Sequence, residues 1–194
     1  LECGVTTNTR APQKMVSFSN TFFVAQVKIM VKRDSGIQSL KDLNGKTIAF
    51  TSGTSADRLI KLAVLARNMT SNYAAGRDSA ASMELLRSGE AQAYVADDGV
   101  LYGQRAVQPD PAEFVVLAEG LSVEPYGLTM RKDDPQFKDL VDGVIAKLMQ
   151  SGEFEAIYNK WFLGPVPPSN VVLDLPISDA LRSLMNSPND KPAF

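Results

Sequence analysis

The chain has 194 residues, with 20 basic and 22 acidic side chains, a net charge of −2 and 44% hydrophobic residues. This length suggests one domain or two small lobes, and it is enough to bury a large core without disulfides. The single cysteine, Cys3, excludes an internal disulfide. The absence of histidine excludes Ser-His-Asp and Cys-His nucleophiles and every histidine-based metal site.

Charge and hydropathy exclude further classes. Lys and Arg are scattered, so no basic patch predicts nucleic-acid binding. No apolar run approaches the ~18–20 residues that span a bilayer. The start, Leu1-Glu2-Cys3-Gly4, is not typical of a signal peptide, and it reads as the middle of a longer segment. No metal site and no cofactor are expected.

The first half of the chain predicts strands that alternate with helices. Residues 21–31 are rich in β-branched and aromatic side chains and predict one long strand. A short helical piece at 40–45 precedes a strand at 46–50 and a helix over 56–67. The pattern then repeats, with strands expected at 72–75, 92–96 and 114–118 and helices at 79–88 and 99–106. This alternation predicts an α/β fold with a mainly parallel sheet.

The second half begins with another predicted strand, over 123–131, which ends in a basic pair and an acidic turn, as the first long strand does. Two helical segments within 137–163 are expected to break at Ser151-Gly152. A short amphipathic helix over 178–185 follows. The similar endings of 21–31 and 123–131 suggest equivalent strands in two related lobes.

The loop Thr51-Ser52-Gly53-Thr54-Ser55 lies between a predicted strand and a predicted helix. A helix N-terminus offers unpaired N–H groups and a partial positive charge, so this loop suits an anion such as a carboxylate. The alternative is that the hydroxyls only cap the helix, since Thr54 and Asp57 fit a capping box. A Walker loop is excluded because no Gly-Lys-[Ser/Thr] follows.

Two further polar groups are candidates. Asp97-Asp98 closes a predicted strand, where ligands of α/β proteins bind, and a carboxylate there could pair with an ammonium group. The alternative is a solvated turn or a helix cap. The cluster 6–10 holds Arg10, whose guanidinium could form a forked pair with a carboxylate, or it is an ordinary surface loop.

Several segments, in order along nearly the whole chain, resemble one protein family, the periplasmic glutamate/aspartate-binding proteins of ABC importers. These belong to the family 3 solute-binding proteins with the type II periplasmic-binding fold. The segments are Leu1–Asn8, Val16–Ser19, Thr51–Thr54, Ala96–Asp98, Tyr126-Gly127, Arg131–Phe137, Ser151–Glu153, Lys160–Phe162, Pro167-Pro168 and Ser187–Lys191.

The resemblance implies two α/β lobes joined by two hinge strands, which close on an amino acid. It implies that residues 1–21 are a remnant of lobe 1, that 22–122 form a complete lobe 2, and that 123–194 return through a hinge strand to the lobe 1 helices and the C-terminal tail. Family members have a further N-terminal part of lobe 1, so this chain is expected to be truncated.

The resemblance also implies site residues. The Gly4 carbonyl and the Thr6 hydroxyl match lobe 1 contacts to the ligand's α-amino and α-carboxylate groups. Thr51 and the backbone of Thr54–Ser55 match a carboxylate site in lobe 2, which includes Ser52 and Gly53. Asp97 matches the acceptor for the α-ammonium.

The chain departs from the family at three positions. The family's carboxylate-binding Arg falls at Pro12, and Arg10 is the hypothetical substitute. A side-chain-recognising His falls at Ser79, which puts the glutamate/aspartate preference in doubt. A second Cys that members carry falls at Leu128, which leaves Cys3 unpaired.

The expected function is therefore capture of a polar or acidic amino acid, glutamate- or aspartate-like, in the periplasm of a Gram-negative bacterium for an ABC permease. One lobe alone is not expected to reach micromolar affinity. The alternatives are a cyclohexadienyl- or arogenate-dehydratase-like enzyme on the same fold and the sensor domain of a receptor. Truncation would also expose apolar surface on the 137–162 helices, which predicts self-association or domain exchange.

Overall fold

The computed structural model describes residues 1–193. It divides into two compact units: Leu1–Ala25 together with the chain from Val123 onward form unit 1, and Gln26–Ser122 form unit 2. Each unit is described by itself. Among residues 1–193, no helix is both long and apolar enough to cross a membrane.

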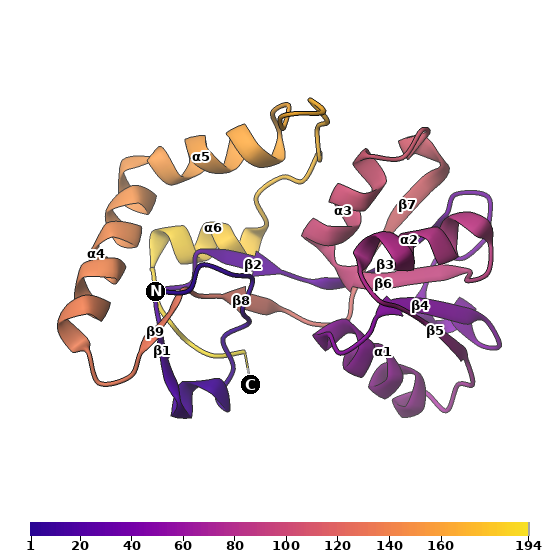
Figure 1. Cartoon of the computed structure of the whole chain (residues 1–194), viewed down its shortest axis with the longest axis horizontal. Helices are drawn as coiled ribbons and strands as arrows, with labels where there is room; N and C mark the ends of the chain where they lie inside the picture. The colour runs from indigo at the N-terminus through magenta and orange to yellow at the C-terminus, as the bar shows by residue number, and fades with distance from the viewer. Residues whose placement is uncertain (194) are drawn as a thin grey trace. The chain divides into compact units, whose positions relative to one another are not determined.

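Unit 2 is built on a five-stranded sheet with the strand order β5-β4-β6-β3-β7 (Figure 1). The strands are β3 (Val27–Lys32), β4 (Thr47–Thr51), β5 (Asn72–Gly76), β6 (Ala93–Asp97) and β7 (Phe114–Gly120). β4 is parallel to β5 and β6, whereas β3 is antiparallel to both β6 and β7. Four strands therefore run in one direction and β3 in the other, which confirms the mainly parallel sheet.

The helices of unit 2 cover both faces of this sheet. α1 (Ser55–Ala66) packs Ile60 and Val64 against Ile48 and Val95 on one face, with the 3₁₀ helix Leu40–Leu43 beside it. α2 (Ser79–Ser88) and α3 (Asp98–Ala106) pack on the other face, which includes Tyr94. A further 3₁₀ turn spans Pro111–Glu113. The period-2 alternation of strand side chains thus supplies two cores from one sheet.

The described part of unit 1 contains two antiparallel two-stranded sheets and three α-helices. β1 (Val16–Phe18) pairs with β9 (Thr129–Arg131), and β2 (Phe23–Ala25) pairs with β8 (Glu124–Tyr126). The helices are α4 (Pro135–Ser151), α5 (Glu153–Phe162) and α6 (Asp179–Asn186), and a 3₁₀ turn spans Pro12–Lys14. The break between α4 and α5 lies at Gly152, where the sequence predicts it.

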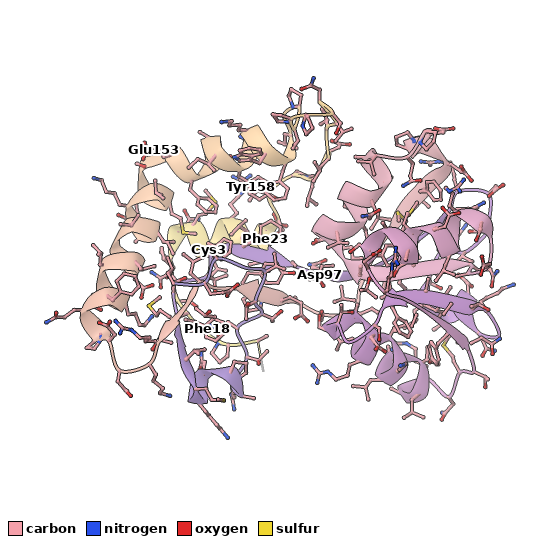
Figure 2. The ribbon with its side chains drawn as sticks, viewed as in Figure 1. Cys3, Phe18, Phe23, Asp97, Glu153 and Tyr158 are labelled. Carbon is pink, nitrogen blue, oxygen red and sulfur yellow. The ribbon has the colours of Figure 1, made fainter. Side chains whose placement is uncertain are left out.

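Aromatic side chains form the core that joins β2 to α5. Figure 2 shows Phe23 and Tyr158 facing one another, and their ring centroids are 6.1 Å apart. Phe23 also stacks on Phe162 at 5.3 Å and on Tyr126 at 5.7 Å. Offset aromatic pairs of this kind are worth about 0.5–1.5 kcal/mol beyond their buried area. In α5, Tyr158 is therefore buried and Phe154 and Phe162 pack beside it, whereas Trp161 is exposed.

The C-terminal tail is tied to the first segment of unit 1. Lys138 of α4 donates hydrogen bonds to Asp142 Oδ2 at 2.7 Å and to the Phe18 carbonyl at 2.8 Å, and its Nζ lies 2.9 Å from Asp190 Oδ2. Asn8, which is fully buried, donates its amide to the Asp190 carbonyl at 2.8 Å. Residues near both ends of the described chain thus share one polar network.

The long strands predicted over 21–31 and 123–131 are each interrupted in the structure, so the prediction is wrong in this respect. The chain leaves the β2 sheet at Ala25 and enters the unit 2 sheet at Val27, and the Gln26 carbonyl between them accepts the Asp98 N–H at 2.8 Å. Likewise β8 ends at Tyr126 and β9 begins at Thr129. The Leu128 N–H donates to Ser19 Oγ at 2.9 Å instead of to a ladder.

Candidate functional site

The loop between β4 and α1 is the first part of the site. Gly53 has a φ of +77°, a left-handed conformation that glycine adopts without strain. Thr54 caps α1: its Oγ1 accepts the Asp57 N–H at 3.3 Å and donates to the Thr51 carbonyl at 2.8 Å. Asp57 completes the turn by accepting the Gly53 N–H at 3.2 Å. The cap by Thr54 is therefore confirmed, but the capping box is incomplete, because Asp57 accepts from Gly53 while the Thr54 N–H donates to the Thr51 carbonyl. The Thr54 hydroxyl proton is already used.

Thr54 caps only one of the N–H groups at the start of α1. The first N–H groups of a helix have no acceptor within the helix, and Thr54 takes only that of Asp57. The N–H groups of Ser55 and Ala56 begin the same turn. Beside them lies an open pocket of about 580 Å³, lined by Gly53, Thr54, Ser55, Asp57, Arg58 and Lys61. A helix N-terminus typically contributes about 0.3–2 kcal/mol to anion binding.

Basic side chains line the same pocket. Lys61 Nζ lies 2.6 Å from Asp57 Oδ1, and its hydrogen bond holds the pKa of Asp57 below the usual range. Lys61 also sits 4.7 Å above the centre of the Phe50 ring, a cation–π contact that fixes the ammonium beside the pocket. Arg58 lies on the exposed side of α1. The pocket thus combines helix N–H groups with Arg58 and with Lys61, whose charge is shared with the Asp57 carboxylate of the same lining, and this combination suits a carboxylate.

The carboxyl end of β6 is the second part of the site. β4 and β6 pair in parallel with Phe50 opposite Val95, so Thr51 and Asp97 lie at the same edge of the sheet. Asp97 is half-buried at the N-cap position of α3, and its side chain makes no capping hydrogen bond. Figure 2 shows it at the end of its strand. A half-buried carboxylate at this edge suits an ammonium group.

Asp98 differs from its neighbour because it is buried, with 7% of its surface exposed. Its Oδ1 accepts the Gly99 N–H at 2.9 Å. Burial raises the pKa of Asp98, and hydrogen bonds from Gln26 and Gly99 and the charge of Lys28 only partly oppose this. Asp98 therefore anchors the start of α3, whereas Asp97 is the more accessible carboxylate.

Behind Thr51 lies a cluster of hydroxyl groups that the sequence pattern did not reveal. Thr51 Oγ1 is 3.1 Å from Ser82 Oγ, and Ser82 donates to the Asp78 carbonyl at 2.9 Å. Ser82 and Tyr94 are fully buried. Burial raises the pKa of the Tyr94 phenol, and the hydroxyls of Thr51 and Ser79 lie near enough to oppose this.

No group among residues 1–193 is aligned to hydrogen-bond the Tyr94 hydroxyl. Leaving a buried hydroxyl unpaired typically costs about 1–3 kcal/mol. The signal that could have identified Ser82 was its position in the helix. It falls on the apolar stripe of α2 with Met83 and Leu86, where a serine has no packing reason to be.

The candidates from the first segment lie in unit 1. Gly4 is half-buried, and Thr6 Oγ1 donates to Glu2 Oε2 at 3.2 Å, which also accepts the Thr129 hydroxyl at 2.9 Å. These hydrogen bonds, that from Thr129 foremost, lower the pKa of Glu2. Arg10 is exposed and makes no ion pair within residues 1–193. Only the unit 2 candidates, Thr51–Ser55 and Asp97, are therefore brought to one sheet edge.

Two further expectations concern the cysteine and metal binding. Cys3 is a free, exposed cysteine, and no group of three or more His, Cys, Asp and Glu side chains within residues 1–193 is arranged to hold a metal ion. Ser52 lies in the same loop as Thr51, exposed, with its N–H donated to the Gly76 carbonyl at 3.0 Å.

Comparison with known proteins identifies relatives of the whole chain. A family model described as bacterial extracellular solute-binding proteins, family 3, matches residues 1–164. A glutamate/aspartate import solute-binding protein from Salmonella typhimurium is 37% identical over 98% of this chain and 63% of its own length. An L-glutamate/L-aspartate-binding protein from Pseudomonas aeruginosa is 39% identical over 100% of this chain and 64% of its own length. The chain thus spans less than two thirds of these relatives.

Solved structures share the fold. An ancestral arginine-binding protein bound to arginine superposes with a TM-score of 0.68 at 28% identity, covering 81% of this chain and 69% of that protein. An ancestral amino-acid-binding protein described as a precursor of cyclohexadienyl dehydratase superposes with a TM-score of 0.67 at 27% identity, covering 81% of this chain and 66% of that one. The periplasmic-binding-protein-like fold is therefore confirmed.

Proposed function

Because the chain belongs to the family 3 bacterial extracellular solute-binding proteins, we propose that it is the ligand-capturing part of an amino-acid importer. The ligand is a polar or acidic amino acid, glutamate- or aspartate-like, bound for uptake by an ABC permease. The relatives named for glutamate and aspartate binding, at 37% and 39% identity, support this ligand class.

The observation that carries the proposal is the opposite charge preference of two neighbouring places in unit 2. The N-terminus of α1, with Ser55, Arg58 and Lys61, suits a carboxylate. The strand edge with Thr51 and Asp97 suits an ammonium. An α-amino acid carries both groups on one carbon atom. We propose the backbone at Thr54–Ser55, together with Ser52 and Gly53, for the carboxylate and Asp97 for the ammonium, with Gly4, Thr6 and Arg10 as the unit 1 contacts.

The test is a ligand screen by isothermal titration calorimetry with glutamate, aspartate, glutamine and asparagine. Asp97→Asn removes the charge but keeps the shape, and it is expected to weaken binding about tenfold or more, because a charge-assisted hydrogen bond is worth about 1.5–3 kcal/mol. Asp110→Asn, at an exposed 3₁₀ turn of the same unit, is the matched control and leaves affinity unchanged. If the unaltered protein binds none of the four amino acids, the proposed ligand class is wrong.

We propose binding without catalysis. The sequence has no histidine, and the buried carboxyl of Asp98 is held by the Gly99 N–H at the start of α3. The specific alternative is dehydratase chemistry, because one protein of similar fold is described as a dehydratase precursor. Incubation with prephenate and with arogenate is expected to give no product, and product formation would establish the enzyme instead.

We further propose a periplasmic location in a Gram-negative bacterium, with the permease as membrane partner. The extracellular character of the family and the Salmonella and Pseudomonas relatives support this. Self-association of this chain is also proposed. Its support is the exposed apolar side chains of the 137–162 helices, Leu140, Val144, Ile157 and Trp161.

A further inference from the structure

The hydroxyl of Thr51 lies at the centre of the proposed site, and the direction of its hydrogen bonds can be worked out from its neighbours. A hydroxyl has a single proton to donate, and two lone pairs with which to accept. Whether Thr51 offers a proton or a lone pair to a ligand decides which ligand groups it can bind. The direction of the Thr51 hydrogen bond is fixed by two buried residues behind it, Ser82 and Tyr94.

The first group is Ser82. Its Oγ lies 2.9 Å from the Asp78 carbonyl oxygen, which can only accept, so the Ser82 proton is donated there. This is the i−4 back-bond that serine forms inside helices. Ser82 Oγ is also 3.1 Å from Thr51 Oγ1. Since the Ser82 proton is already used, Thr51 is the donor of that second hydrogen bond.

The position of Ser82 is rigid. Gly76, at the end of β5, lies so close that a Cβ at this position would fall 2.6 Å from the Ser82 nitrogen and 2.9 Å from its Cα. The glycine therefore allows the first turns of α2 to approach the strand edge. Ser82 itself is fully buried, so solvent does not compete for its hydroxyl.

The second group is Tyr94. Its phenol is buried, has no aligned partner among residues 1–193, and lies near the hydroxyls of Thr51 and Ser79. A tyrosine phenol, with an ordinary pKa of about 10, is protonated at neutral pH and has one proton to donate. If Tyr94 donates to Thr51, it occupies one of the two lone pairs of Thr51, which leaves the Thr51 proton on Ser82 and one lone pair for a ligand.

We infer that Thr51 presents a lone pair, and no proton, to the ligand site, so that its partner is an N–H group of the bound amino acid and not a carboxylate. This inference rests on the proposed function for its ligand. It separates Thr51 from the carboxylate site at the start of α1 and joins it to Asp97, which is also an acceptor. The N–H group comes from the α-ammonium or from a side-chain amide.

Neutron diffraction from deuterium-exchanged crystals tests the direction without any ligand. The expected deuteron between the two hydroxyls is bonded to Thr51 Oγ1 and points at Ser82 Oγ. A deuteron bonded to Ser82 and pointing at Thr51 would overturn the inference. This outcome is decided even if the protein binds no amino acid, in which case the proposed function fails alone.

Binding measurements identify the source of the N–H group. Thr51→Val keeps the shape and removes the hydroxyl, and Thr47→Val, on the same face of β4, is the matched control. If Thr51 accepts from the ammonium, the substitution weakens glutamate and glutamine equally, about tenfold. Donation to the α-carboxylate would also weaken both, and the position of the deuteron on Thr51 or Ser82 separates these two cases. If it accepts from an amide, only glutamine is weakened. Weakening of glutamate alone would show a donor to a carboxylate and contradict the inference.

A second variant tests the preference between glutamate and glutamine. Ser82→Ala removes the acceptor behind Thr51 and releases the Thr51 proton toward the ligand site. If Thr51 faces the ligand side chain, the ratio of glutamate affinity to glutamine affinity is then expected to rise, by about fivefold if one neutral hydrogen bond is gained. If Thr51 faces the α-ammonium, both affinities change alike and the ratio stays the same. Ser88→Ala removes another back-bonded hydroxyl of α2 that is remote from Thr51, and it leaves the ratio unchanged. An unchanged ratio in Ser82→Ala, where Thr51→Val has weakened glutamine alone, would count against the proposed direction.

Discussion

The pKa values of two carboxyl groups in unit 2 are shifted in opposite directions by their surroundings. Asp98 is buried at the start of α3 and its pKa is raised, chiefly by burial. Asp57 is bound by Lys61 and its pKa is lowered. The two residues lie in the same compact unit, so one unfolding transition reports on both. Their opposite behaviour makes a matched pair for measuring how charge affects stability.

The raised pKa of Asp98 predicts a loss of stability as pH rises. From the ordinary value of 3.8 up to its raised value, the folded state binds more protons than the unfolded state. The free energy of unfolding therefore falls as pH rises through that window, by at most about 1.4 kcal/mol per pH unit. Asp98→Asn removes this dependence and keeps an acceptor for the Gly99 N–H. Urea unfolding from pH 3.5 to 7 should show the variant gaining stability relative to the unaltered protein as pH rises.

Asp57→Asn serves as the control of opposite sign. Because the Asp57 pKa is lowered, its stabilisation is present above the unfolded value and is lost as pH falls toward the folded value. The difference between the unaltered protein and this variant should therefore shrink in acid. If both variants show a pH-independent difference, these carboxyls do not titrate differently in the folded and unfolded states.

At the scale of elements, the joint between α4 and α5 depends on one backbone conformation. Gly152 has a φ of +82° and serves as the C-cap of α4 and the N-cap of α5. Nothing lies within 4 Å of a Cβ built there, so an added methyl group meets no steric obstacle. The cost of replacing Gly152 is therefore the cost of its left-handed conformation alone.

Gly152→Ala is expected to lower the free energy of unfolding of unit 1 by about 1–2 kcal/mol. Gly143→Ala provides the matched control, because Gly143 lies inside α4 and also has open space around a built Cβ. That substitution should raise stability by up to about 1 kcal/mol, since alanine favours helix. Thermal and urea unfolding measure both, and equal effects of the two substitutions would contradict a left-handed joint.

Hydrophobic periodicity predicted most helices and strands, because local residue patterns decide them. The helix over 56–67, the break at Gly152 and the strand at 92–96 all correspond to observed elements. The interruption at Gln26 could not be predicted, since 21–31 reads as one apolar strand and the break depends on a bond to Asp98, far along the chain. The Thr51 cluster was equally hidden, because Ser82 and Tyr94 approach it only in the fold.

For the molecule as a whole, the exposed apolar side chains of α4 and α5 bear on its association state. Leu140 and Val144 are one helical turn apart on α4, with 63% and 52% of their surfaces exposed. Ile157 and Trp161 are likewise one turn apart on α5. Exposed apolar side chains on two successive helices favour contact with another polypeptide when they lie close enough to share one surface.

We therefore predict concentration-dependent dimerisation of this chain in analytical ultracentrifugation. The double substitution of Leu140 and Val144 by Lys should weaken the dimer by about tenfold or more, because it replaces buried apolar area with charge. Leu62 and Leu65 of α1 are 52% and 72% exposed, and their replacement by Lys is the control that leaves association unchanged. A strictly monomeric protein at all concentrations would refute the proposal.

The discontinuity of unit 1 has a consequence for biosynthesis. Unit 2 is one continuous segment, Gln26–Ser122, whereas unit 1 needs Asn8 and Lys138 to meet Asp190. Since domains generally fold as units during translation, unit 2 can mature while the ribosome is still extending the chain. The first segment of unit 1 cannot complete its contacts until the residues around Asp190 have left the exit tunnel. A nascent chain stalled after unit 2 has folded and before Asp190 has emerged would therefore have a folded unit 2 and an incompletely folded unit 1.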